Sequence, residues 1–165
     1  MEKLYIKQKV FSWGDSFTVK NEYGEDLYRV KGEVLSLGKK LHIYDSADRE
    51  LALIRQKVMT FLPRYFIDID GQQAAEVVRE MSFFKPRYSI HGPDWQVEGD
   101  FWGHDYRLAA GEKTVAGLKK AWMSWGDSYE LEVARREDAL LALAVVLVID
   151  CVNAASAAAA ASAST

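Results

Sequence analysis

The side chains best placed to do chemistry in this chain are cations that recur at one position of a repeated strand pattern. Residues 6–10, 54–58, 78–82 and 118–122 can be aligned on it. Polar and apolar residues alternate, so the cations lie on the face opposite the apolar one. They are Lys7, Lys9, Arg55, Lys57, Arg79 and Lys119. If the apolar face meets a core and neighbouring strands gather these cations, the stripe predicts a site for anionic lipid headgroups, each cation contributing about 1 kcal/mol.

A second basic cluster, which gives a second headgroup candidate, surrounds a glycine-containing loop. It comprises Arg29, Lys31, Lys39 and Lys40. For both sets the alternative is ordinary surface charge, with strand lysines that discourage edge pairing. Residues 32–39 do not form a phosphate loop, because the spacing is one residue too long and no Ser or Thr follows the Gly-Lys pair.

Imidazoles and carboxylates gather within one short segment and raise the question of metal binding or catalysis. They are His91, Asp94, Asp100, His104 and Asp105. Imidazole and carboxylate can bind a transition metal, but no HExxH spacing is present, and no GxSxG elbow supports a catalytic serine. We therefore expect no enzyme, no metal and no cofactor. A hydrolase or metal site at residues 91–105 remains a third hypothesis, which requires His91, His104 and a carboxylate to converge in one pocket.

Asp150 directly follows the longest apolar run, where an unpaired buried carboxylate would be costly. The repeat gives Gln8, Gln56, Glu80 and Lys120 a shared inward-facing position. We predict a hydrogen bond or ion pair to Lys120, and the alternative is that Asp150 reaches solvent at the mouth of a barrel.

Three tryptophans fall in predicted turns, namely Trp13, Trp102 and Trp125. Tryptophan is enriched at lipid interfaces, so these side chains could dip into one. The alternative is that they cover the end of a core.

One apolar element must organise the rest. Residues 139–149 are eleven consecutive apolar residues, ALLALAVVLVI. A helix that is apolar on every side must be enclosed, and a run of this length is more typical of a buried core helix than of a membrane span. The predicted helix runs from about residue 137 to 153, and the lone cysteine, Cys151, is expected to be a buried, inert thiol.

The preceding chain predicts about twelve short strands at the spacing of a barrel or sandwich. The near-identical turns SWGDSF at residues 12–17 and SWGDSY at residues 124–129 suggest hairpins that lie close together where a barrel closes. Such a barrel is too wide for its own side chains to fill, so the helix must occupy its interior. Fold class is therefore mainly β: an antiparallel closed barrel around a C-terminal helix.

Length, charge and cysteine content limit the number of domains, the partners and the cellular location that we expect. The chain has 165 residues and a net charge of −3, which predicts one domain over residues 1–153, followed by an Ala/Ser-rich tail at 154–165. The acidic balance predicts no nucleic-acid partner. With a single cysteine and no secretory run, we expect a cytoplasmic protein.

The chain resembles the LURP-one-related family in its bacterial YxjI-like branch, within the tubby C-terminal-domain-like superfamily that includes the phospholipid scramblases. The resemblance spans about residues 4–152 and rests on residues 17–19, 24–32, 41–45 and 51–54 and on the apolar helix. It implies a twelve-stranded barrel around a buried C-terminal helix. For function it implies phosphoinositide binding, membrane tethering or lipid scrambling. At the scramblase calcium loop this chain has Asp127, Tyr129 and Leu131, and an oxygen cage cannot use the last two.

The sequence thus predicts a non-enzymatic protein that binds anionic phospholipid headgroups or lies at the periphery of a membrane. The alternative is a protein-interaction scaffold with no lipid ligand.

Overall fold

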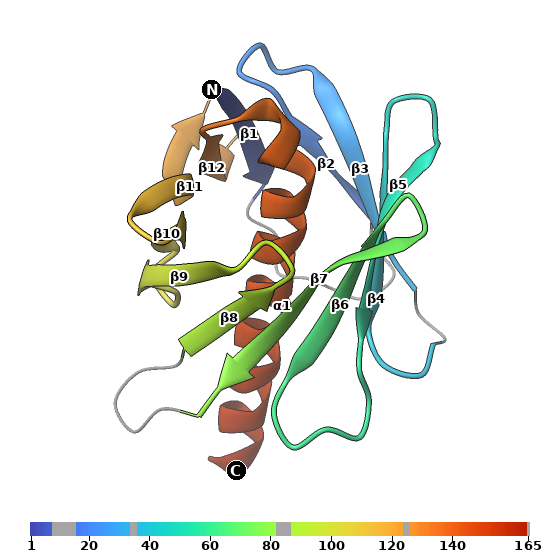
Figure 1. The fold of residues 1–165 in the computed structure, drawn as a ribbon, viewed down its shortest axis with the longest axis vertical. Coiled ribbons are helices and arrows are strands. Elements are labelled where there is room, and N and C mark those ends of the chain that lie inside the picture. The colour runs from blue at the N-terminus through green and yellow to red at the C-terminus, as the bar shows by residue number, and fades with distance from the viewer. Residues whose placement is uncertain (8–15, 34–35, 82–86, 124–125, 165) are drawn as a thin grey trace.

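The computed structural model describes residues 1–7, 16–33, 36–81, 87–123 and 126–164 (Figure 1). Twelve strands precede one long helix. The strands are β1 (Glu2–Lys7), β2 (Ser16–Lys20), β3 (Asp26–Gly32), β4 (Lys40–Tyr44), β5 (Glu50–Gln56), β6 (Arg64–Ile69), β7 (Gln72–Glu80), β8 (Arg87–His91), β9 (Trp95–Asp100), β10 (Asp105–Ala110), β11 (Lys113–Met123) and β12 (Gly126–Val133).

The strands form a closed antiparallel barrel, as the sequence predicted. Each strand pairs with its neighbours in the chain, and β1 also pairs with β12, so that the first and last hairpins meet at the seam. At that seam Leu4 lies opposite Leu131, and both are fully buried. Apolar residues on the inner face of each strand point at the helix, because alternate side chains of a strand lie on opposite faces.

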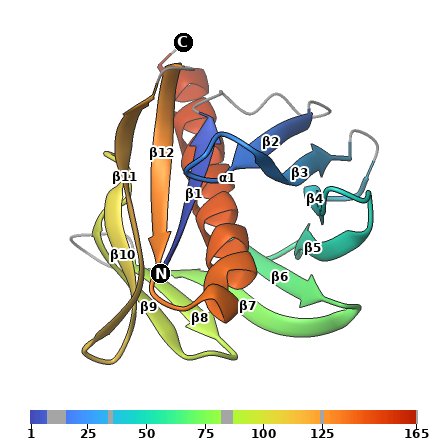
Figure 2. The same cartoon turned by 90° about the horizontal axis from the view of Figure 1, so that it is seen from above.

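The helix passes through the barrel. A short 3-10 turn, η1 (Arg136–Asp138), leads into α1 (Ala139–Ala163), and Figure 2 shows the strands arranged around it. Residues 142–149 of α1 are all buried, and Ala139, Ala142 and Ala144 supply small side chains there. By length and composition the segment Arg136–Ala163 could cross a membrane, but most of its apolar window is enclosed by the barrel, which accounts for its composition.

The helix is longer than predicted, since it continues through residues 154–163 instead of ending near Asn153. These residues are exposed apart from Ser156, which is half-buried. The segment predicted as a tail is therefore the protruding end of the core helix. Alanine is the strongest helix former, which explains why the helix persists where no strand packs on it.

One strand was predicted in the wrong register. The alignment placed Val78 on the inner face of β7, but Ala75, Val77 and Arg79 are the inward-facing residues, with Val77 opposite the buried Ile90. A shift of one residue moves every side chain to the other face. The two consecutive valines, Val77 and Val78, fit either phase, so alternation alone could not decide.

The two ends of the barrel carry different loops. Loops 21–25, 45–49, 70–71, 92–94 and 111–112 surround the start of α1, and we call this end the acidic end. Residues 33, 36–39, 57–63, 81 and 101–104 belong to four loops at the end where α1 leaves the barrel. We call the described residues of these four loops the exit rim.

Candidate functional site

The predicted stripe of cations does not form a single surface. Its described members lie on β1, β5, β7 and β11 or just beyond them, and none of these strands is the neighbour of another in the barrel. Lys7 and Lys119 are on one wall, while Arg55 and Lys57 are on the opposite wall. Lys9 lies outside the described residues.

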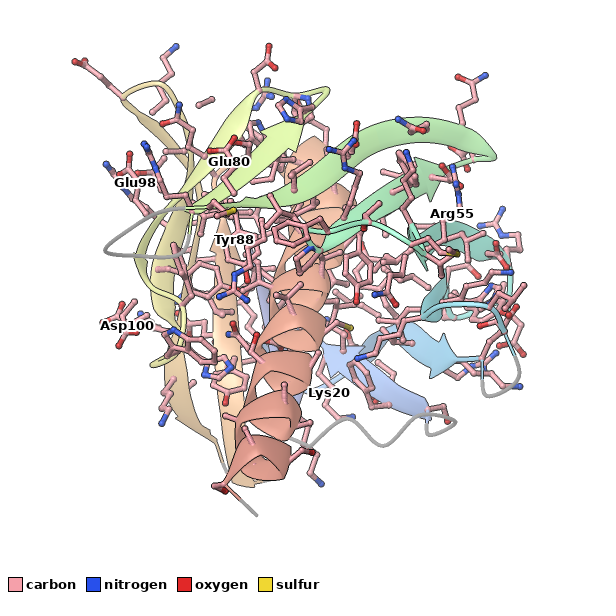
Figure 3. The ribbon with its side chains drawn as sticks, turned by 90° about the horizontal axis from the view of Figure 1, so that it is seen from below. Lys20, Arg55, Glu80, Tyr88, Glu98 and Asp100 are labelled. Carbon is pink, nitrogen blue, oxygen red and sulfur yellow. The ribbon has the colours of Figure 1, made fainter. Side chains whose placement is uncertain are left out.

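Two members of the stripe already have carboxylate partners. Arg55 donates from Nε to Asp68 Oδ2 at 2.7 Å and lies over the ring of Phe66, 4.6 Å from its centroid. Lys119 Nζ is 3.1 Å from Glu130 Oε1. Figure 3 shows Arg55 and Glu98 pointing away from the helix and Tyr88 pointing toward it. Arg55 and Lys119 are thus outward, as predicted, but their charge is largely balanced.

Glu130 anchors a network on the outer face of the seam. Tyr5 Oη donates to its Oε2 at 2.8 Å, and Lys3 and Lys119 lie within ion-pair distance of Oε1. Burial and this hydrogen bond raise the pKa of Tyr5 to about 12. Burial alone would raise the pKa of Glu130, but the donors around it outweigh that effect and the pKa lies below its ordinary value. These residues stabilise the wall, with no uncompensated charge for a ligand.

Arg79 does not belong to an outer stripe at all. Its guanidinium reaches into the barrel and donates from Nη1 to Ser156 Oγ on α1 at 2.9 Å. The prediction of an outward Arg79 was wrong because of the register shift in β7. The residue instead holds the helix at its exit.

The second basic cluster is brought together, although acidic residues accompany it. Arg29 and Lys31 lie on β3, Lys40 lies on β4, and Lys40 is directly opposite Arg55. Arg29 pairs with Asp48 at 2.7 Å, and Lys40 lies 3.7 Å from Glu33. Lys39 is in the exit rim, where its amide donates to the side chain of Gln56.

Large apolar side chains are exposed mainly at the exit rim. Among the described residues eight large hydrophobic side chains are exposed, and six of them belong to the rim: Leu37, Val58, Met59, Phe61, Met81 and Trp102. The side chains of Phe61 and Leu37 are 91% and 90% exposed, so both are almost fully accessible to solvent. Contiguous exposed apolar side chains mark interaction surfaces. Trp102 is one of the exposed apolar side chains of the rim, whereas Trp13 and Trp125 lie outside the described residues.

Two rim loops pack on each other, which places their apolar tips side by side. The backbone amide of Gln56 donates to Lys39 O at 2.8 Å. Gly38 adopts a φ of +77°, and a Cβ there would lie 2.6 Å from Val58 Cγ1. Glycine is needed here both for its backbone conformation and for this close approach. Leu37 and Val58 are consequently parts of one surface.

Met59 is held in a strained backbone conformation at the tip of loop 57–63. Its φ is +60° and its side chain is fully exposed. A left-handed conformation costs a residue with a Cβ about 1–2 kcal/mol. Strain at an exposed apolar residue is a feature of functional sites, because selection for stability alone would remove it.

Cations without a carboxylate partner concentrate toward the same end. Among the described residues, the exposed cations with no carboxylate within ion-pair distance on the rim half of the barrel are Lys7, Lys31, Lys57, Arg87 and Lys120. Lys113 and Arg136 are the corresponding residues near the acidic end. The rim half of the barrel thus combines the apolar loop tips of the exit rim with Lys57 in one of its loops and with four cations on the adjoining strands, none of which has a described carboxylate within ion-pair distance.

Polar contacts fix the helix where it reaches the rim. Asp150 is only 14% exposed, and its Oδ1 lies 3.2 Å from Nε2 of His104, whose ring stacks on Tyr129. Asn153 Nδ2 donates to Phe101 O at 2.9 Å. The predicted partnership of Asp150 with Lys120 was wrong, because the 101–104 turn brings His104 to the carboxylate and Lys120 is exposed. Glu80 is likewise exposed, not inward-facing.

Burial governs the chemistry of the groups beside this contact. It raises the pKa of Asp150, and the contact with His104 offsets only part of the shift. It also raises the pKa of the Cys151 thiol to about 12, as expected for an inert buried cysteine.

The two histidines that the hydrolase or metal hypothesis requires to converge lie at opposite ends of the barrel. His91 ends β8 at the acidic end, and His104 belongs to the exit rim, with all of β9 between them. No group of three metal-binding side chains is found within the described part of the chain. The geometry required by the hydrolase or metal hypothesis is not met.

A hollow of about 730 Å³ opens on the wall formed by β9 to β12. Its floor is exposed because Gly117 carries no side chain. Arg107 beside it is paired with Glu98 at 2.6 Å and with Thr114, and Lys119 is paired with Glu130. Both cations that line the hollow are therefore paired with carboxylates, unlike the exposed cations of the rim half of the barrel.

Sequence reasoning missed the exit rim, although one signal was present. Residues 58–62, VMTFL, place four apolar residues at the end of the repeated strand pattern of residues 54–58 and in the connection that follows it. Turns are normally polar, so apolar residues there should prompt a search for a contact surface.

Comparisons with known proteins agree with this architecture. The family model described as LURP-one-related matches residues 2–150. The chain is 40% identical over 152 residues to the uncharacterized protein YxjI of Bacillus subtilis, an alignment that covers 92% of this chain and 94% of that protein. An X-ray structure of the protein AT5G01750 from Arabidopsis thaliana has a similar fold, with a TM-score of 0.63 at 20% identity over 91% of this chain and 90% of that one. Because the family match and the bacterial relative both cover nearly the whole barrel and its helix, the chain belongs to the LURP-one-related family.

Proposed function

We propose that this protein binds the surface of an anionic phospholipid membrane through its exit rim, as a peripheral and non-enzymatic protein. The observation that carries the proposal is the coincidence, at one end of the barrel, of exposed apolar loop tips and exposed cations without carboxylate partners. Either feature alone has an ordinary explanation. Together they match an interface in which apolar groups enter the acyl boundary and cations meet phosphates.

The energies involved are sufficient for reversible binding. Removing a large apolar side chain from water contributes about 1.5–3 kcal/mol when burial is complete. Each cation near an anionic surface adds about 1 kcal/mol. Two or three apolar tips with a similar number of cations would therefore support binding in the micromolar range, after the costs of immobilisation are subtracted.

The charge of the acidic end favours a single orientation of the protein on the membrane. The loops of this end carry seven carboxylates. Asp45 and Asp48 are paired with Arg49 and Arg29, whereas the other five have no cation within ion-pair distance among the described residues: Glu22, Glu25, Asp70, Asp94 and Glu112. An anionic membrane would repel this end and attract the other. The protein would consequently dock with the acidic end facing the aqueous phase.

A sedimentation assay tests the proposal directly. The protein is mixed with vesicles of phosphatidylcholine, with or without phosphatidylserine or a phosphoinositide, and the bound fraction is measured. We expect binding only to the anionic vesicles, and a loss of about tenfold or more in affinity when Met59→Ser and Phe61→Ser are combined. Tyr23→Ser is the matched control, because Tyr23 is 80% exposed at the acidic end and its loss should leave the affinity unchanged.

Two outcomes would contradict the proposal. Equal sedimentation with and without vesicles would remove membrane binding and leave the rim as a surface for a protein partner, the scaffold hypothesis. Equal losses from the rim pair and from Tyr23→Ser would show that binding does not depend on the exit rim.

A further inference from the structure

We infer that the protruding end of α1, residues 154–163, enters the membrane interface together with the loops and forms the centre of the docking surface. This inference rests on the proposed function and adds an element to it. The rim loops would contact the membrane around the open end of the barrel, whereas the helix would contact it at the centre of that end.

The position of the helix end is fixed by the barrel. Arg79 donates to Ser156, and Asn153 donates to the backbone of Phe101, so one strand and one rim loop hold the helix as it leaves. Figure 1 shows the last turns of α1 extending to the same end of the molecule as loop 57–63. A flat surface that touched the tips of these loops would also meet the end of the helix.

The chemistry of the segment suits an interface of low polarity. From Cys151 to Thr165 there is no charged side chain, although 27% of the whole chain is charged. Each described serine hydroxyl of the segment has a protein partner. Ser156 accepts from Arg79, Ser162 donates to Ala158 O and Ser164 donates to Ala161 O. Such internal pairing lets a helix leave water without stranding hydroxyl groups.

The depth of entry has a physical limit. The last four carbonyls of any helix lack intrahelical partners, and no unsatisfied backbone group is stable in the hydrocarbon of a bilayer. The helix end would therefore stop among the headgroups and the first acyl carbons. It would not cross the membrane, because residues 142–149 remain the core of the barrel.

A pair of matched substitutions tests this inference. Ala158 is exposed on the protruding helix, and Ala47 is exposed at the acidic end. Ala158→Asp and Ala47→Asp change the net charge of the protein equally, so they differ only in place. For vesicles containing phosphatidylserine we expect Ala158→Asp to weaken binding about fivefold, and Ala47→Asp to change it by less than about twofold. Thermal melting of both variants should match the parent protein.

Fluorescent labelling separates this inference from the proposed function. Cysteines placed at Ala158, Met59 or Ala47 would carry an environment-sensitive dye, while the buried Cys151 should stay unlabelled in the native protein. We expect the dyes at Ala158 and Met59 to shift to the blue on adding anionic vesicles and to be quenched by a lipid-attached quencher. The dye at Ala47 should not respond.

The possible results are distinct. A response at Met59 without one at Ala158 would keep the proposed function and overturn the inference about the helix. Unaltered binding by Ala158→Asp would overturn it as well. Silence at both positions, with no sedimentation, would remove the proposed function itself.

Discussion

The two ends of this barrel have the same architecture and opposite chemistry. Both consist of short loops between antiparallel strands, and both use residues in the left-handed backbone conformation. At the acidic end those residues are Asp48, Asp70 and Asp94, together with glycines, which tolerate this conformation well. At the exit rim they are Gly38, His104 and Met59, and of these methionine tolerates the conformation least.

The difference in turn residues between the two ends indicates that they serve different roles, one in stability and the other in contact with a partner. The turns of the acidic end are close to the optimum for local stability and expose acidic side chains. The exit rim accepts backbone strain at Met59 and exposes apolar side chains, and these features reduce stability or solubility in water. Such a pattern is expected where a surface must contact something other than water. The predictions below test whether the ends differ in binding while sharing one core.

The largest loss of stability is expected from a substitution in the core, which supports both ends of the barrel. Leu147 is fully buried on α1, so Leu147→Ala should lower the free energy of unfolding by about 3–5 kcal/mol. On the same helix the exposed substitution Ala158→Ser should cost less than about 0.5 kcal/mol. Urea denaturation followed by circular dichroism measures both. Similar values for the two variants would mean that the helix is not enclosed.

The second prediction concerns charge at the two ends. Replacing Lys57, Arg87 and Lys120 together by glutamine should weaken binding to anionic vesicles roughly 100-fold at low salt. The control replaces Lys113 and Arg136, which should have little effect although charge is also removed. Raising the ionic strength should shrink the difference, because salt screens exposed charges. If both sets weakened binding equally per charge, attraction would be general and the comparison between the ends would lose its meaning.

A third prediction uses the buried carboxylate just inside the rim. The pKa of Asp150 is raised by burial, so the folded state holds a proton more tightly than the unfolded state. The wild-type protein therefore loses stability as the pH rises from the ordinary aspartate pKa through the raised one. Asp150→Asn removes that loss and should raise the free energy of unfolding at pH 7.

Melting curves across the pH range provide the check on Asp150. The advantage of the asparagine variant should disappear below the ordinary aspartate pKa of about 3.9, where the wild-type carboxyl is neutral in both states. A variant that is less stable than the wild type at pH 7 would show that the contact with His104 outweighs the cost of burial.

The smallest change in stability is expected from a substitution of Met59, at the strained tip of loop 57–63. Asparagine tolerates a positive φ better than methionine does. Met59→Asn should therefore raise the free energy of unfolding by about 0.5 kcal/mol. The same change removes an exposed apolar side chain and should weaken vesicle binding by a few fold. Calorimetry and sedimentation on the same preparation would compare the two. A loss of stability would indicate that Met59 makes a contact that the turn requires.

Most of the fold could be predicted from sequence because its pattern is local. Alternation identified the strands, and eleven apolar residues identified the enclosed helix. The register of β7 could not be fixed, since Val77 and Val78 fit either face. The end of the helix was placed too early because alanine and serine resemble a linker in composition, although alanine favours helix.

The site was less accessible to sequence reasoning because it depends on which segments the fold brings together. Arg55 and Lys119 occupy equivalent positions in the repeat, yet they lie on different walls and each meets a carboxylate from a neighbouring strand. His104 meets Asp150 across 46 positions of sequence, through a turn whose direction no local pattern specifies. The rim likewise combines loops from four hairpins, none of which is unusual alone.

The order of elements along the chain also constrains how the molecule is made. The strand that seals the ring against β1 and the helix that occupies its interior both follow the other eleven strands in the sequence. While the ribosome is still translating the earlier strands, they have neither a closing partner nor a filling for their apolar faces. The ring can therefore be completed only after residues up to about Asp150 have emerged, and a nascent chain stalled before that point should remain dependent on chaperones.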